Sequence, residues 1–423
     1  DSVIVRQNEH ELAAALGLPQ TGPTFETGLT ARAYTDPARL GPWARARFKG
    51  TVETTRGCHF PCRFCFINAG DNYGKRWQRR PVEAVIADIG RYYARGVKNI
   101  VFHDAEFFGA ARKQYPHVRA LLEAIKTHYP DLRFMIYARA DTLLWFDDFE
   151  LLKQAGLCNV FLGAESLVQS DLDALKKKLK VEDIFACVSA LKRHDIHMHL
   201  NFILFNRNSS VATIRENIAM MREIYADNPA AVGLPLFVFS FETDWSGEAA
   251  ENALSDATYV QADLDMRSQP AVEACFDATL EPYLEVCRLL AYEWLKKVVD
   301  LSHRAGARSP YWAANTIAAE SGGAEASAPA AAAGRDGVAA WYGGLAEFCL
   351  DVMALYLDRF EAGALTLENL PQAKAELFER IEAYYQRLPE PLRDVGTREN
   401  HADALTYQEA AQLVELDRSE EHT

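Results

Sequence analysis

The chain has 423 residues, a formal net charge of −14 at pH 7, and 49% hydrophobic and 25% charged residues. A chain of this length is too long for a single domain with one typical hydrophobic core. Two domains, or one domain with a large extension, are therefore expected. The negative charge argues against a nucleic-acid partner, because phosphate binding depends on clustered Lys and Arg. The sequence shows no apolar run long enough to cross a bilayer and no secretory signal, so we expect a cytoplasmic protein with no membrane partner.

Strand and helix patterns alternate between about residue 50 and residue 245. Apolar or β-branched runs are separated by segments with apolar residues at helical spacing. The six expected strands are 49–55, 97–104, 133–141, 158–166, 196–205 and 232–242. Strands joined by helices predict a parallel sheet with right-handed crossovers, and six strands suggest an incomplete α/β barrel.

The pattern changes after about residue 250. Amphipathic helical segments follow one another, and a low-complexity stretch at 320–337 is typical of a flexible loop. We therefore expect an N-terminal extension at 1–47, a barrel domain at 48–250 and a helical C-terminal region at 251–423.

Three of the eight cysteines stand close together in "RGCHFPCRFCFIN", residues 56–68. Their spacing is Cys58-x3-Cys62-x2-Cys65, and the other five cysteines are scattered singly, as small buried hydrophobic residues would be. Four thiolates would close a structural zinc site, whereas three leave a coordination position open. In an iron–sulfur cube, three cysteines leave one iron free to bind another molecule. The loop follows the first strand, at the end where β/α barrels gather catalytic groups.

The segment "CHFPCRFC", including the aromatic Phe64 before the last cysteine, resembles the signature of the radical S-adenosylmethionine (radical SAM) superfamily. The resemblance covers roughly residues 48–245 and is to the core of the cobalamin-dependent branch. It implies a partial (β/α)6 barrel with a [4Fe–4S] cluster on Cys58, Cys62 and Cys65. The free iron would chelate the methionine part of SAM. An external donor of the flavodoxin or ferredoxin type would supply the electron that releases a 5′-deoxyadenosyl radical.

The same resemblance implies further SAM-binding residues. "FHDAEFF" stands where the family has a Gly-Gly-Glu-like segment that receives the methionine amino group, which makes Asp104 and Glu106 candidates. In "LGAES", Glu165 and Ser166 match residues that contact the ribose and carboxylate. Arg139 is expected to pair with the SAM carboxylate. The alternative for Arg139 and Glu165 is a structural ion pair within the barrel.

Strand alternation gives an expected set of polar side chains that face the lumen. They are Glu53, Asp104, Tyr137, Arg139, Asp141, Glu165, His197, His199, Asn201, Ser240, Glu242 and Asp244. Carboxylates outnumber cations in this set, which favours a hydroxylated, amine-bearing substrate, although solvated carboxylates at a barrel rim are the alternative. Asp104, His199, Glu242 and Asp244 are the candidate catalytic acid–base groups.

Together these features predict a radical SAM enzyme that abstracts hydrogen from a polar small molecule, such as a sugar, aminocyclitol or aminoglycoside-like antibiotic intermediate. Dehydration by a lyase is favoured over dehydrogenation or epimerisation. Only about fifty residues precede the barrel, so we expect a relative that lacks a cobalamin domain. Modification of a peptide or RNA is the competing enzymatic hypothesis, and a non-catalytic iron–sulfur or zinc protein is the other alternative.

Overall fold

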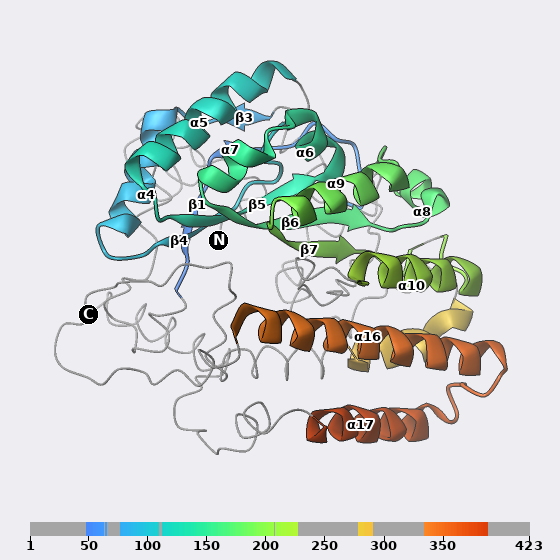
Figure 1. Ribbon diagram of the computed structural model, residues 1–423. Helices are drawn as coiled ribbons and strands as arrows, with labels where there is room; N and C mark the ends of the chain where they lie inside the picture. Colours follow the sequence, from blue (N-terminus) through green and yellow to red (C-terminus); the bar gives the residue numbers. More distant parts are fainter. Residues whose placement is uncertain are drawn as a thin grey trace, which may run out of the picture.

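A computed structural model gives the fold of the chain (Figure 1). The structure describes residues 48–62, 64–65, 77–109, 112–206, 208–226, 278–290 and 334–387. The expected strand at 232–242, with Glu242 and Asp244, lies outside the described residues, as does the N-terminal extension 1–47.

Five parallel strands form the main sheet in the order β1-β4-β5-β6-β7. They are β1 (Gly50–Val52), β4 (Asn99–Phe102), β5 (Arg133–Arg139), β6 (Leu157–Glu165) and β7 (His197–Phe202). Two short strands, β2 (Thr55–Arg56) and β3 (Gln78–Arg79), pair antiparallel beside it. The parallel sheet with its connecting helices is an α/β fold consistent with a partial barrel.

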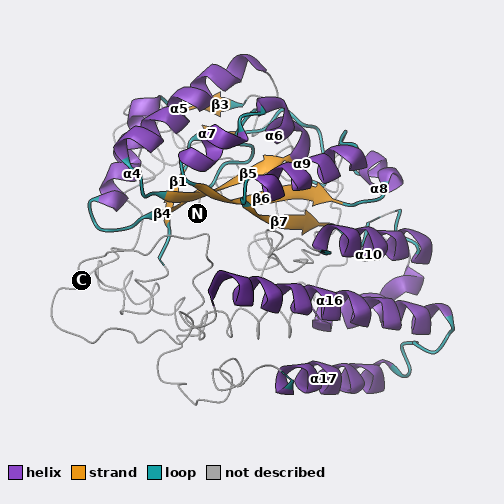
Figure 2. Ribbon diagram, viewed as in Figure 1, coloured by secondary structure: helices purple, strands orange, loops and turns teal. Residues whose placement is uncertain are grey.

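Helices connect the strands and extend beyond the sheet (Figure 2). In the first part they are α4 (Val82–Tyr93), the 3-10 turn η4 (Arg112–Gln114), α5 (Tyr115–His128), α6 (Ala140–Phe146), α7 (Phe149–Gln154), α8 (Gln169–Ala174), α9 (Val181–Arg193) and α10 (Val211–Tyr225). The C-terminal part contains η5 (Ala278–Leu280), α14 (Glu281–Leu289), α16 (Gly334–Glu361) and α17 (Leu370–Gln386). Helix α16 begins inside the segment 320–337 that was expected to be a loop.

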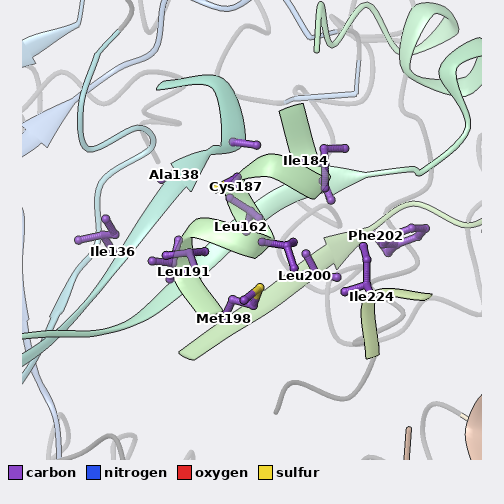
Figure 3. Close-up of a cluster of buried hydrophobic side chains, with 14 of the residues drawn as sticks. Ile136, Ala138, Leu162, Ile184, Cys187, Leu191, Met198, Leu200, Phe202 and Ile224 are labelled. Carbon is purple, nitrogen blue, oxygen red and sulfur yellow. The ribbon is translucent and has the colours of Figure 1, made fainter. Parts of the chain in front are cut away.

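Strand β5 shows how the sheet divides its two faces. Phe134, Ile136 and Ala138 alternate along the strand and are buried at 0%, 0% and 6% exposure. They belong to the apolar core between the sheet and the helices that cover it, together with α9 residues such as Cys187 and Leu191 (Figure 3). The residues between them point to the opposite, inner face, as the alternation predicts.

The helical C-terminal region packs against the barrel domain through α10 (Figure 1). Arg215 of α10 forms ion pairs with Asp358 and Glu361 of α16, at 2.7 and 2.8 Å. These pairs are exposed, so burial of apolar residues such as Leu350 and Met353 supplies most of the stabilisation. Among the described helices, none has a stretch long and apolar enough to span a bilayer.

Candidate active site

The cysteine loop begins directly after β2. Gly57 at its start has a φ of 84°, a left-handed conformation that glycine adopts without steric cost. Cys62 is buried at 7% exposure, and Cys58 and Cys65 are partly buried. Burial raises the pKa of the Cys58 thiol to about 12, and the charges of nearby Glu106 and of the other two cysteines add to this shift. The three thiols therefore lie close enough together for the charges of Cys62 and Cys65 to act on Cys58.

The three thiols fit an iron–sulfur cluster better than a single metal ion. Thiolates are the ligands of iron–sulfur clusters, and a cube places its cysteines on separate iron corners. Within the described part of the chain, no three Cys, His, Asp or Glu side chains converge on a single-metal site. The assignment of Cys58, Cys62 and Cys65 as cluster ligands stays a prediction.

Asp104 connects the ends of β1 and β4. Its carboxylate accepts hydrogen bonds from the main-chain N–H groups of Thr54 (2.7 Å) and Thr55 (2.9 Å) and from the Thr54 hydroxyl (2.5 Å). Burial raises its pKa to about 7, although these hydrogen bonds act in the opposite direction. Because β4 ends at Phe102, strand alternation does not extend to Asp104, and its side chain turns toward the β1–β2 connection. Its catalytic and cofactor roles stay predictions.

Glu106 is buried at 1% exposure, close enough to Cys58 for its charge to raise the pKa of that thiol. One carboxylate oxygen accepts from the Thr142 hydroxyl (2.9 Å) and from the Phe108 N–H (3.2 Å). The other accepts from the Arg139 N–H (3.1 Å). Burial raises the pKa of Glu106 to about 7 against the effect of these donors. The side chain therefore ties the end of β4 to the start of α6.

Arg139, at the end of β5, contacts several other residues. Its guanidinium forms a bidentate pair with Asp141, with both N–O distances at 2.9 Å. It also lies 3.7 Å from the Cys62 sulfur and 3.7 Å from the centre of the Phe60 ring. Arg139 thus forms an ion pair within the barrel domain, and its expected contact with the SAM carboxylate stays a prediction. The pair forms because the chain turns into α6 at Ala140, where a continuing strand was expected.

Glu165 ends β6 in a left-handed conformation, with a φ of 67°. Its two carboxylate oxygens accept from Lys177 Nζ and from Asn201 Nδ2, both at 2.9 Å. The Asn201 Oδ1 is buried without a hydrogen-bond partner. A buried acceptor beside an oriented carboxylate fits the hydroxyl and ammonium donors of SAM.

Ser166 points away from this cluster. Its hydroxyl lies 2.9 Å from an Asp171 carboxylate oxygen and 3.0 Å from the Asn217 Oδ1, and it accepts from the Val168 N–H. Strand β6 ends at Glu165, whose backbone is left-handed, so strand alternation does not fix the direction of Ser166. The SAM contact expected for Ser166 stays a prediction, and the contacts that the structure shows connect β6 with α8 and α10.

Rings cross the inner face of the sheet. His103 and Tyr137 lie 5.6 Å apart, Tyr137 and Phe161 lie 5.0 Å apart, and Phe161 is in register with His199. His199 packs edge-on against His197 at 4.6 Å. Burial lowers the pKa of His199 to about 4, so its imidazole is neutral at pH 7. The inner face thus carries His199 as expected, with aromatic neighbours that alternation alone did not single out.

The structure therefore brings the cysteines, Phe64, Glu106, Arg139 and Glu165 to the carboxyl end of the sheet. Sequence analysis missed Lys177, which contacts Glu165 and lies with its Nζ 5.5 Å from the centre of the Phe64 ring. In the sequence it stands within "KKKLK", a run that is typical of a solvated surface.

Several curated proteins resemble the chain in sequence. It is 28% identical over 158 residues to an uncharacterized methyltransferase of Pyrococcus horikoshii, covering 37% of this chain and 32% of that protein. It is 27% identical over 175 residues to the hopanoid C-3 methylase of Methylococcus capsulatus (40% and 32%), and 29% identical over 141 residues to the tryptophan 2-C-methyltransferase of Streptomyces laurentii (31% and 22%). The chain thus spans about a third or less of these relatives. Their names overturn the expectation of sugar dehydration, since they are methylases and methyltransferases.

Among solved structures, the cobalamin-dependent SAM radical enzyme OxsB, with aqua-cobalamin and SAM bound, superposes with a TM-score of 0.52 at 16% identity, covering 85% of this chain and 56% of that one. Residues 52–229 match the family model of the radical SAM superfamily, whose members bind a [4Fe–4S] cluster and SAM. Residues 52–229 therefore form a radical SAM domain.

Proposed function

We propose that this chain is the radical SAM part of a methyltransferase that methylates a carbon atom of a small molecule with an apolar or aromatic ring surface. The observation that carries the proposal is the likeness to relatives named as methylases of hopanoids and of tryptophan. Both are ring-containing molecules, and neither name refers to a sugar.

The charges of the site support the same substrate class. Among the described residues, Glu53 pairs with Arg56 at 2.7 Å and Glu165 pairs with Lys177 at 2.9 Å. Asp104 is hydrogen-bonded by the β1–β2 connection. These carboxylates are already compensated, which removes the reason to expect a cationic substrate. The rings of the inner face offer aromatic surface for a ring-bearing substrate.

The chain's own residues would prepare the site for the reaction. When bound, the cluster supplies the electron that cleaves SAM reductively, and SAM is the methyl source. Cys58, Cys62 and Cys65 would hold the cluster, and Glu165 with Asn201 would orient the polar groups of SAM. His199 stays neutral at pH 7, and its buried Nδ1, which has no hydrogen-bond partner, is available to a donor group of a bound molecule.

An inventory of products distinguishes methylation from the other outcomes. Replacing C–H by C–CH3 consumes two SAM molecules and two electrons from the reductant. One SAM gives its methyl group and leaves S-adenosylhomocysteine, and the second is split into methionine and 5′-deoxyadenosine, which carries away the hydrogen atom. We would incubate the anaerobically reconstituted protein with SAM, a reductant and either L-tryptophan or a hopanoid, with and without added cobalamin. Methylation predicts S-adenosylhomocysteine and methylated product in the reactive mixture. A substrate that is consumed with 5′-deoxyadenosine but without S-adenosylhomocysteine would refute the proposal.

A further inference from the structure

Lys177 is a buried lysine inside an otherwise exposed run. It is 5% exposed, whereas Lys176, Lys178 and Lys180 are exposed. Lys176 and Lys178, on either side of it, have φ values of 52° and 53°, a left-handed conformation that is sterically unfavourable for residues other than glycine. Two of three consecutive residues adopt this conformation, and the resulting turn directs only Lys177 inward.

The buried Lys177 ammonium lies in a space shaped by Glu165 and Gly163. It donates to Glu165 Oε1 at 2.9 Å. A Cβ atom on Gly163 would lie 2.9 Å from Lys177 Nζ and 2.9 Å from that same oxygen, so the glycine leaves the space that the pair occupies. Burial lowers the pKa of Lys177, but the charges of Glu165 and Cys62 outweigh this effect and raise it, so the side chain is charged.

The ammonium also faces the cysteine loop. The Lys177 Nζ lies 5.5 Å from the centre of the Phe64 ring, in a cation–π arrangement. Phe64 is the residue directly before Cys65 in the sequence. The Lys177 main-chain carbonyl accepts from an Arg139 guanidinium N–H at 2.9 Å, and that guanidinium stacks on Phe60. Two buried cations thus lie against Phe60 and Phe64 of the loop.

These contacts matter for a cluster held by three thiolates. Such a cluster carries net negative charge, which becomes more negative when an electron is added. In a water-excluded site a nearby cation stabilises the reduced form more than the oxidised form, because Coulomb interactions are weakly screened there. A cation close to the loop therefore makes the cluster easier to reduce.

We propose that Lys177 is a positioning residue that fixes Glu165 and raises the reduction potential of the cluster. The proposal rests on the cluster assignment within the proposed function, but not on the methyl-transfer outcome. The proposal also predicts that Lys177 and Glu165 shift the reduction potential in opposite directions, because Glu165 places a negative charge beside the same loop.

The test is a redox titration of the reconstituted holoprotein, followed by electron paramagnetic resonance without substrate. Lys177→Met should keep its iron content and shift the midpoint potential to more negative values, and Lys177→Arg should restore most of the shift. Lys178→Met, in the same loop with the same left-handed backbone but an exposed side chain, is the matched control and should titrate like the parent. Glu165→Gln should shift the potential in the positive direction.

Full iron loading of Lys177→Met with the parent's potential would overturn the proposal. If Lys177→Met fails to load a cluster, the midpoint potential of Glu165→Gln becomes the test. A Glu165→Gln potential equal to that of the parent would refute the electrostatic role. Since no substrate is present, a failure of methyl transfer leaves this test intact and is recognised separately from the product inventory.

Discussion

Glu165→Ala should be among the most destabilising single substitutions at the carboxyl end of the sheet. Glu165 is 3% exposed, and its oxygens accept from Lys177 and Asn201. Removing one partner of a buried ion pair leaves an uncompensated buried charge, at a cost of about 3–5 kcal/mol in the free energy of unfolding. Because residue 165 has a left-handed backbone, Glu165→Gly should be less destabilising than Glu165→Ala by about 1 kcal/mol.

Urea denaturation of the protein without cofactors, at pH 7, measures these differences. The double variant Glu165→Ala/Lys177→Met should be more stable than Glu165→Ala alone, since it removes the isolated charge as well. An alanine variant as stable as the parent, or a double variant no more stable than the single one, would refute the buried-pair reasoning. The loss of the carboxylate should also weaken SAM binding by about 1.5–3 kcal/mol, which calorimetry on the reconstituted parent and on the Glu165→Gln variant would measure.

Three further predictions follow from the same contacts. Replacing Cys58, Cys62 and Cys65 together by Ala should abolish the cluster absorbance and reductive SAM cleavage, and bound zinc without sulfide in the parent would contradict the assignment. His199→Gln should reduce the loss of stability between pH 7 and pH 5. The folded imidazole stays neutral down to about pH 4, whereas the unfolded one takes up a proton below about pH 6.5. Acidification from pH 7 to pH 5 therefore favours unfolding of the parent by about 2 kcal/mol, and by less for a partly exposed ring. Equal pH dependence of urea midpoints in parent and variant would exclude this contribution. Ser166→Ala should lower stability by about 1–3 kcal/mol in the same assay, because Asp171 and Asn217 lose a buried partner, and should leave SAM affinity unchanged; a large loss of SAM affinity at parental stability would restore the cofactor contact.

The strand pattern predicted the sheet because local sequence determines which residues face the helices. Phe134, Ile136 and Ala138 alternate with Tyr137 and Arg139 in the sequence, and the structure buries the first set against the helices. The same logic missed α6, because "ARADTLLWF" supports either a continuing strand or a new helix and only tertiary contacts choose between them. Asp141 therefore pairs with Arg139 from the first turn of a helix.

The partners of the site could not be predicted from spacing. Lys177 lies 12 residues beyond Glu165 in a lysine run, and its burial depends on a backbone turn that sequence alone does not reveal. The outward orientation of Ser166 likewise depends on Asn217, which comes from α10, 51 residues away. The cysteine motif was informative because its chemistry depends on spacing within one loop, whereas these contacts depend on the packing of distant elements.

Mössbauer spectroscopy of the protein reconstituted with isotopically enriched iron tests the central claim most directly. If Cys58, Cys62 and Cys65 hold a cube with one open iron, the spectrum should show one [4Fe–4S] cluster per chain. Addition of SAM should change the signal of a single iron and leave the other three unchanged. A spectrum that SAM does not alter, or iron that binds without forming a cube, would contradict the account.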